Sequence, residues 1–186
     1  LREDRRHMTD DDIGRLIDEI ELPLNLEIAA TDEMLAIALR HRPHAACIVP
    51  ERRAERTTEG GLDAAAGHRH LERFVDRLGA AGIRVSLFIE PDPRQLDAAG
   101  SLGASVVELH VGAYCDAGPG ERPDRPERIR APAAQAADLG PPCHAGPGTC
   151  FHTLAPTAQS PTIRDPNIRH FPVRHAHLGA LAPPTP

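Results

Sequence analysis

An α/β fold with a parallel sheet is the structure that the sequence predicts, and three observations favour it. Short apolar runs alternate with amphipathic helical repeats along the first part of the chain, which is typical of βαβ units. Glutamates lie inside or directly after four of these runs, at positions 27, 51, 90 and 108. No G-x-G-x-x-G turn follows any run, which weighs against a dinucleotide-binding fold. An eight-stranded barrel and an open doubly wound sheet both fit these observations.

The first two predicted helices begin after threonines. Three aspartates follow Thr9, as suits a helix N-terminus, and the next apolar residues have helical spacing: Ile13, Leu16, Ile17 and Ile20. The run LNLEIAA at residues 24–30 is predicted as a strand. A second helix is predicted from Thr31 through MLAIALRHR, and Pro43 ends it before the strand AACIVP.

The alternation continues with two more helices and two more strands. One helix ends at Gly82 and carries its apolar residues at helical spacing: Leu71, Phe74, Val75 and Leu78. The run RVSLFIE that follows is predicted as a strand. The segment PDPRQLDAAGSLGA predicts a short helix, and SVVELHV predicts a further strand.

Length and composition limit the classes of protein that fit. The 186 residues suit one domain, and a hydrophobic content of 40% is sufficient for a core. The formal net charge of -6 gives no general attraction to nucleic acid or to anionic membranes. We expect a cytoplasmic protein, because no run has the length of a membrane-spanning helix and no signal-peptide pattern is present. The 4 cysteines lack the spacing of a disulfide framework and are expected to be reduced.

Proline divides the single domain expected over residues 1–186 into two parts. Only 5 of the 19 prolines precede residue 119, and 14 lie in the last 68 residues. Helix interiors and central strands exclude proline. We therefore expect residues 1–116 to be the well-specified part and residues 117–186 to be a divergent, proline-rich part.

Glu27 and Glu108 are the candidate acid–base residues, because each lies within an apolar run. Burial of a carboxyl group in a strand disfavours its charged form and suits it to proton transfer. The structural alternative is that both carboxylates pair with arginines. The sequence gives these two interpretations equal weight.

Two polar segments are candidates for phosphate binding. The loop at residues 50–63 offers hydroxyls and amides that can hold an anion, namely those of Thr57, Thr58, Gly60 and Gly61. A solvated connection is the alternative and is favoured without other observations. The opening segment LREDRRH can clamp phosphates, or pair with Glu3 and Asp4, through its basic residues Arg2, Arg5, Arg6 and His7.

A metal site is not expected. Cys143, His144, Cys150 and His152 lie close together, but the order C-H-x5-C-x-H fits none of the close-pair zinc patterns. A loop rich in proline and glycine would also have to fold around the ion.

Six stretches, in this order and with this spacing, resemble the pyridoxine 5'-phosphate synthase family of vitamin B6 (pyridoxine) biosynthesis. They are LREDRRH at 1–7, LNLEIA at 24–29, CIVPERR at 47–53, TTEGGLD at 57–63, VSLFIE at 85–90 and VELHVGAY at 107–114. The resemblance is strong over residues 1–116 and weaker beyond. It implies a (β/α)8 TIM barrel with its site at the C-terminal mouth, assembled as a homo-octamer.

The resemblance also implies a transferase activity. Family members condense 1-deoxy-D-xylulose 5-phosphate with 3-amino-2-oxopropyl phosphate into pyridoxine 5'-phosphate, releasing phosphate and water, without a metal or organic cofactor. Glu27 matches the family's proton-accepting glutamate, and Glu108 matches the glutamate that stabilises the transition state. Substrate-binding positions of the family are matched by Arg2, His7, Thr57, Gly148 and His170.

Three departures from the family pattern bear on activity. In the family a base histidine, the first strand and the first helix precede LREDRRH, so we expect an incomplete barrel with a degraded C-terminal part. Pro147 stands in place of the general-acid histidine, and proline cannot transfer a proton. Arg169 stands in place of a glycine whose backbone approaches phosphate. The alternative to an active synthase is a catalytically impaired, phosphate-binding remnant of that enzyme.

Overall fold

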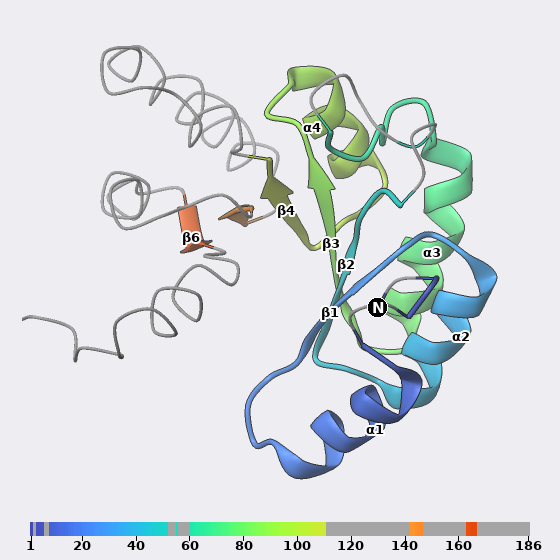
Figure 1. Ribbon diagram of the computed structural model, residues 1–186. Helices are drawn as coiled ribbons and strands as arrows, with labels where there is room; N and C mark the ends of the chain where they lie inside the picture. Colours follow the sequence, from blue (N-terminus) through green and yellow to red (C-terminus); the bar gives the residue numbers. More distant parts are fainter. Residues whose placement is uncertain are drawn as a thin grey trace, which may run out of the picture.

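A computed structural model of the chain describes residues 1, 3–5, 8–51, 55, 60–110, 142–146 and 163–166. Over these residues, six strands form one sheet whose strands follow one another in sequence order, and all neighbouring pairs are parallel. The helices lie on one side of this sheet (Figure 1). A doubly wound sheet reverses its strand order at a switch point. The sequential order therefore confirms the predicted parallel α/β fold and matches the winding of a barrel rather than that of a doubly wound sheet.

The first four elements are helices α1 (Asp10–Glu19) and α2 (Asp32–His41) and strands β1 (Asn25–Ile28) and β2 (Ala45–Ile48). The predicted threonine caps are confirmed. Thr9 accepts a hydrogen bond from the Asp12 amide while the Asp12 carboxylate accepts one from the Thr9 amide, so α1 begins with a capping box. Thr31 caps α2 by accepting from the Met34 amide.

The next four elements along the chain are α3 (His68–Ala80), β3 (Arg84–Ile89), α4 (Pro93–Ser101) and β4 (Val106–Leu109). Gly82 follows α3 with φ +77°, a conformation that suits glycine and turns the chain into β3. Asp92 caps α4, and Pro93 occupies its first turn, where a missing amide hydrogen costs nothing. All four elements lie where the sequence predicts them.

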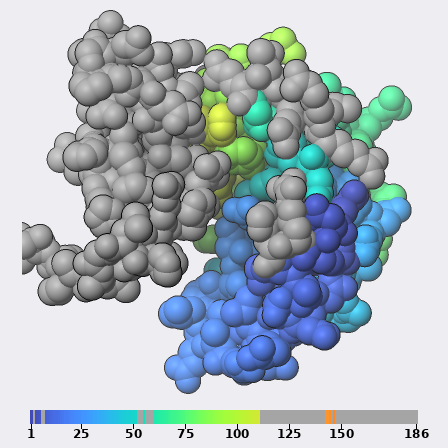
Figure 2. Space-filling model, viewed as in Figure 1, coloured from blue at the N-terminus to red at the C-terminus, as the bar shows by residue number. Residues whose placement is uncertain are grey.

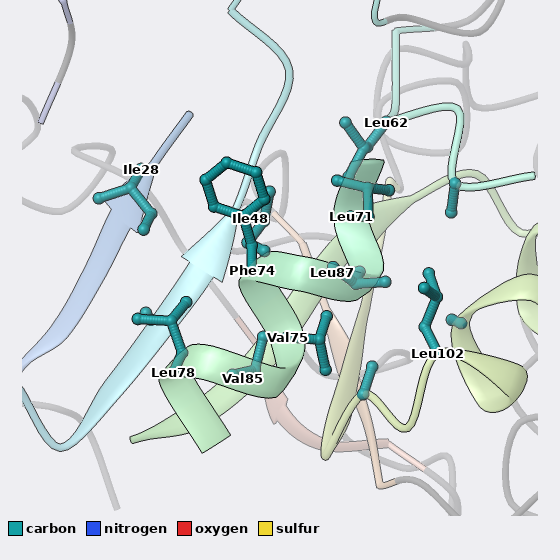
Figure 3. Packing of buried hydrophobic residues seen from close by; sticks show 14 of the residues in the cluster. Ile28, Ile48, Leu62, Leu71, Phe74, Val75, Leu78, Val85, Leu87 and Leu102 are labelled. Carbon is teal, nitrogen blue, oxygen red and sulfur yellow. The ribbon is translucent and has the colours of Figure 1, made fainter. Parts of the chain in front are cut away.

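The hydrophobic core lies between the helices and the sheet. Alternate strand residues face the helices, and Leu26, Ile28, Ile48, Val85 and Leu87 belong to this core. Helix α3 contributes the four apolar residues that its spacing predicts, namely Leu71, Phe74, Val75 and Leu78 (Figure 3). These helix residues and the buried residues of β1, β2, β3 and β4 belong to one continuous core.

Two short strands come from the proline-rich part of the sequence. Strand β5 (Cys143–Ala145) pairs with β4, and β6 (Ile163–Pro166) pairs with β5, with a register shift between Cys143 and Ala145. The sequence pattern does not predict either strand. Residues 117–141 of the proline-rich part lie outside the described residues.

Candidate active site

The face of the sheet opposite the helices, called the inner face here, carries the polar strand residues. Laterally paired residues of a parallel sheet point to the same side, and Glu27, Cys47 and Ser86 are paired in one row across β1, β2 and β3. The next row pairs Phe88 with Glu108. None of these five side chains belongs to the hydrophobic core on the helix side. The two predicted acid–base residues therefore share the inner face.

Glu108 is buried, as the sequence predicts. Its side chain lies on β4, and the residue retains 4% of its surface exposure. The Cys47 thiol donates a weak hydrogen bond to Glu108 Oε2 at 3.8 Å, across the small side chain of Ser86 on the intervening strand. A carboxylate held in this way has a defined orientation on the inner face.

The Cys47 thiol is protonated rather than nucleophilic. Burial raises its pKa well above the usual range, and the negative charge of Glu108, then that of Glu27, raises it further. The Ser86 hydroxyl lowers this pKa, with an influence smaller than that of burial and of Glu108 but larger than that of Glu27. Cys47 is therefore suited to donate a hydrogen bond to a carboxylate and not to attack a substrate.

Glu27 is exposed, and the expectation of a buried carboxylate at this position is wrong. Its neighbours on β1, Leu26 and Ile28, take the positions that face the core, so Glu27 points to the opposite side. Within the part of the chain that the structure describes, Glu27 forms no ion pair with an arginine. The structural alternative of an arginine-paired carboxylate stays a prediction, because Arg2 and Arg6 lie outside the described residues.

The two glutamates are not adjacent. Strands β1 and β4 are three strand spacings apart, which corresponds to roughly 14 Å between their main chains at about 4.8 Å per spacing. Cys47 and Ser86 lie between them, and the charges of both glutamates act on the Cys47 thiol. The inner face thus presents two carboxylates across an extended row of small polar side chains.

A second carboxylate group lies where β3 and β4 end. The buried Glu90 side chain accepts a hydrogen bond from the Gly61 amide at 2.7 Å, and His110 Nδ1 is 3.4 Å from Glu90 Oε1. The positions of Glu90 and His110 at strand ends are visible in the sequence, but their contact is not. The pair lies at the carboxyl ends of β3 and β4, the end of the strands at which barrel enzymes carry their active sites.

The opening segment lies against the carboxyl end of β2, where the Glu3 amide donates to Glu51 Oε1 at 3.0 Å. Arg5 is an ion-pair residue, as one of the two interpretations predicts, but its partners differ. It pairs with Asp10 at 2.8 Å and with Glu33 at 2.5 Å, and it donates a hydrogen bond to the Glu3 carbonyl at 2.9 Å. The Arg5 side chain therefore connects the opening segment to α1 and α2 through ion pairs.

Several predicted site residues lie outside the described residues: Arg2, Arg6, His7, Thr57, Thr58, Gly148 and His170, as well as Pro147 and Arg169. Their roles stay predictions. In the space-filling view, yellow-green atoms of the chain near β4 reach the surface beside green and cyan atoms of earlier segments (Figure 2).

Cys143 and His144 point in opposite directions because they are successive residues of β5. Cys143 is buried in the core on the helix side, and burial raises the pKa of its thiol to about 12. Within the described ranges, no group of three or more His, Cys, Asp or Glu side chains is arranged to hold a metal ion.

Comparison with known proteins identifies close relatives. The family model described as "Pyridoxal phosphate biosynthesis protein PdxJ" matches residues 1–182. A pyridoxine 5'-phosphate synthase from Rhodospirillum rubrum is 65% identical over 162 residues, which cover 87% of this chain and 65% of that protein. Another from Ruegeria pomeroyi is 51% identical over 187 residues, covering 98% and 75%. The chain thus spans just under two thirds of the length of the Rhodospirillum relative.

A solved structure supports the fold. The deoxyribose phosphate aldolase from Aeropyrum pernix aligns with a TM-score of 0.59 at 16% identity, over 95% of this chain and 87% of that chain. This likeness is to a TIM-barrel-like fold and concerns the fold alone. No helix among the described residues has both the length and the apolar character needed to cross a membrane.

Proposed function

The chain belongs to the PdxJ family of pyridoxal phosphate biosynthesis proteins, and from this membership we propose that the protein containing it is a pyridoxine 5'-phosphate synthase. The proposed reaction condenses 1-deoxy-D-xylulose 5-phosphate with 3-amino-2-oxopropyl phosphate, forming pyridoxine 5'-phosphate, inorganic phosphate and water. The observation that carries the proposal is the 65% identity to a curated synthase over 162 residues. Identity at this level does not favour the alternative of a non-catalytic remnant.

The proposed architecture is a (β/α)8 barrel whose interior is the inner face. Six parallel strands in sequential order are the arrangement of consecutive strands in such a barrel. Closure of the sheet into a barrel would place the inner-face side chains, including those of Glu27 and Glu108, in the barrel interior. An incomplete barrel stays a prediction.

Glu27 is proposed as the residue that accepts protons from the substrate. Its carboxylate is exposed on the inner face, so a bound substrate can reach it. Carbonyl condensation, dehydration and ring closure all require proton transfer by positioned groups. A base must lie within hydrogen-bond reach of the proton that it removes, and an accessible strand residue meets this condition.

Glu108 is proposed to stabilise positive charge in the transition state. Its carboxylate is buried, and the hydrogen bond that the protonated Cys47 thiol donates to it favours its charged form. A fixed charge in a site with little water acts more strongly on a developing charge than the same charge in solvent. The separation of Glu27 and Glu108 suits an intermediate that joins two phosphorylated units.

The phosphate groups are proposed to bind Arg2, His7, Thr57, Gly148 and His170, on the basis of the family resemblance. Arginine, threonine hydroxyls and glycine amides are suitable phosphate ligands. A cytoplasmic homo-octamer is likewise proposed from the family.

The test measures formation of pyridoxine 5'-phosphate by the full-length protein with both phosphorylated substrates. We expect product from the wild type, and a loss of about 10²–10³ in kcat for Glu27→Gln and for Glu108→Gln, the range typical of general acid–base and electrostatic groups. Glu19→Gln is the matched control, because Glu19 is an exposed carboxylate at the end of α1 paired with Arg15. A wild type that makes no product would contradict the proposal, and unchanged kcat in both variants would contradict the assigned roles.

A further inference from the structure

Glu90 and His110 form a carboxylate–imidazole pair that has no role in the proposed site so far. Glu90 directly follows β3, and His110 directly follows β4. The His110 amide donates to the Ile89 carbonyl at 2.8 Å, so the strand pairing continues to the level of this pair. His110 lies two residues beyond Glu108 and therefore on the same, inner side of the sheet.

Glu90 is held in place by the backbone of the preceding loop. The Gly61 amide donates to Glu90 Oε1 at 2.7 Å. A Cβ atom on Gly61 would lie 2.7 Å from the Glu90 amide nitrogen and 2.9 Å from the Ile89 carbonyl carbon, so a larger residue would displace the loop from the strand. The close approach of Gly61 thus fixes the carboxylate without an arginine or lysine.

The His110 ring is held in one orientation by its neighbours. Its Nδ1 atom is buried, has no hydrogen-bond partner among the described residues and lies 3.4 Å from Glu90 Oε1, and the ring packs perpendicular to Phe88 with ring centroids 5.2 Å apart. The side chain still retains 18% of its exposure. Because Nδ1 itself is buried, the accessible part of the ring is elsewhere on its edge. A carboxylate at one ring nitrogen fixes the tautomer and leaves the other nitrogen for a ligand.

We propose that His110 is an additional proton-transfer residue of this site and that Glu90 is its positioning residue. The proposal rests on the proposed condensation of an amine with a ketone. In the dehydration of the resulting carbinolamine, protonated His110 gives its Nε2 proton to the leaving hydroxyl. The C–O bond breaks, the nitrogen lone pair forms the C=N bond, and water departs. The iminium then returns one proton to Nε2, which restores the imidazolium beside Glu90.

The charge distribution of the pair suits this step. The carboxylate of Glu90 lies beside Nδ1, where it offsets the positive charge of the imidazolium. Glu108 lies on the same face of the sheet, two residues earlier, and its negative charge would stabilise an iminium formed beside His110. The distance of 3.4 Å is longer than a standard hydrogen bond, and such contacts in unliganded sites tighten when substrate binds.

Kinetics of four variants of the full-length protein test the role of His110. Asparagine places an amide near the position of Nδ1 and lacks Nε2, so His110→Asn should lower kcat about 10²-fold or more with little change in KM. Glu90→Gln keeps an acceptor for Gly61 and should lower kcat about tenfold. The double variant should be no slower than His110→Asn, because the two residues act as a unit. His44→Asn, at an exposed histidine, is the control and should retain wild-type kcat.

Nitrogen-15 NMR of the histidine rings tests the positioning without turnover. We expect neutral His110 to carry its proton on Nδ1 in the wild type and to lose this preference in Glu90→Gln. A mixed tautomer in the wild type, or kcat of His110→Asn within threefold of wild type, would overturn the proposal. An inactive wild type would overturn the proposed function and with it the proton transfer by His110. If that inactive protein still showed the Nδ1–H tautomer, the positioning of His110 by Glu90 would be supported, so the two failures are distinguishable.

Discussion

At the scale of single residues, burial separates groups with the same chemistry into different roles. Glu27 is exposed and Glu108 is buried, although both are strand glutamates on the inner face. The cysteines Cys47 and Cys143 are both buried, but Cys47 faces Glu108 and Cys143 faces the helices. Position on the pleat decides which face of the sheet a side chain occupies, as for the two cysteines, while the surroundings on that face decide its exposure, as for the two glutamates.

Stability should fall as the pH rises above about 9, because of the two buried thiols. Burial raises the pKa of Cys143 to about 12 and that of Cys47 well above 9.0. In the unfolded chain these thiols ionise from about pH 8.5 upward, while the folded state keeps its protons. The unfolded state is thereby favoured by up to about 1.4 kcal/mol per pH unit for each thiol. Below about pH 8 both the folded and the unfolded chain keep their thiol protons, so the thiols do not lower the free energy of unfolding there.

Urea unfolding at about pH 8 and about pH 10.5 measures this effect. The chain contains no lysine, so few other side chains change charge in this window. In Cys143→Ala the loss of stability between the two pH values should be smaller by about 2 kcal/mol. Equal losses in the variant and the wild type would show that Cys143 does not bind its proton more tightly when folded.

At the scale of elements, close backbone approach decides how β5 joins the sheet. Gly146 follows β5, and its amide donates to the Leu109 carbonyl at 2.7 Å. A Cβ atom at this position would lie 2.5 Å from that carbonyl oxygen and 2.8 Å from the ring of Phe88. Only glycine fits between β4 and the aromatic ring against which His110 packs.

Gly146→Ala should therefore destabilise the protein, by an amount in the range of about 1–3 kcal/mol that overpacking costs. Gly79→Ala is the matched control, because Gly79 lies in α3 and a Cβ there meets nothing within 4 Å. That substitution should stabilise the protein by about 0.5–1 kcal/mol. Thermal unfolding followed by circular dichroism distinguishes the opposite signs, and a stabilised Gly146→Ala would show that β5 lies farther from β4.

At the scale of the whole molecule, the two faces of one sheet differ in composition, with an apolar core on one side and the proposed site on the other. On the helix side, an apolar core includes residues of β1, β2, β3 and β4. The inner side carries carboxylates, a thiol, a hydroxyl and an imidazole. Adjacent residues of one strand therefore serve different purposes. Ile48 belongs to the core with 0% exposure, and Cys47 before it contacts Glu108.

Substitution of these two neighbours should separate the two properties. Ile48→Ala should lower the free energy of unfolding by about 2–5 kcal/mol and leave kcat of the folded enzyme unchanged. Cys47→Ala removes the weak hydrogen bond to Glu108 and should lower kcat about fivefold, the equivalent of about 1 kcal/mol. Both quantities are measured on the same preparations. Equal effects of the two substitutions on kcat would contradict the division between the faces.

The sequence by itself determined the family, the parallel α/β fold and the order of elements through residue 110. These depend on local signals, namely threonine and aspartate caps, helical spacing of apolar residues and short β-rich runs. It also identified Glu27 and Glu108 as unusual, because charged residues rarely lie inside apolar runs. It did not predict β5 and β6, whose short length and proline-rich surroundings give no such signal.

Only the tertiary structure decided which face each polar residue occupies and which residues meet there. The strands of a covered parallel sheet read as continuous apolar runs, so alternation does not reveal which side the helices cover. For this reason the exposure of Glu27 differs from expectation. The partners of Arg5 on α1 and α2 differ because they depend on how the opening segment packs against these helices. The contact of Gly61, Glu90 and His110 joins a loop and the ends of two strands, and packing over long sequence distances, which no local pattern records, brings them together.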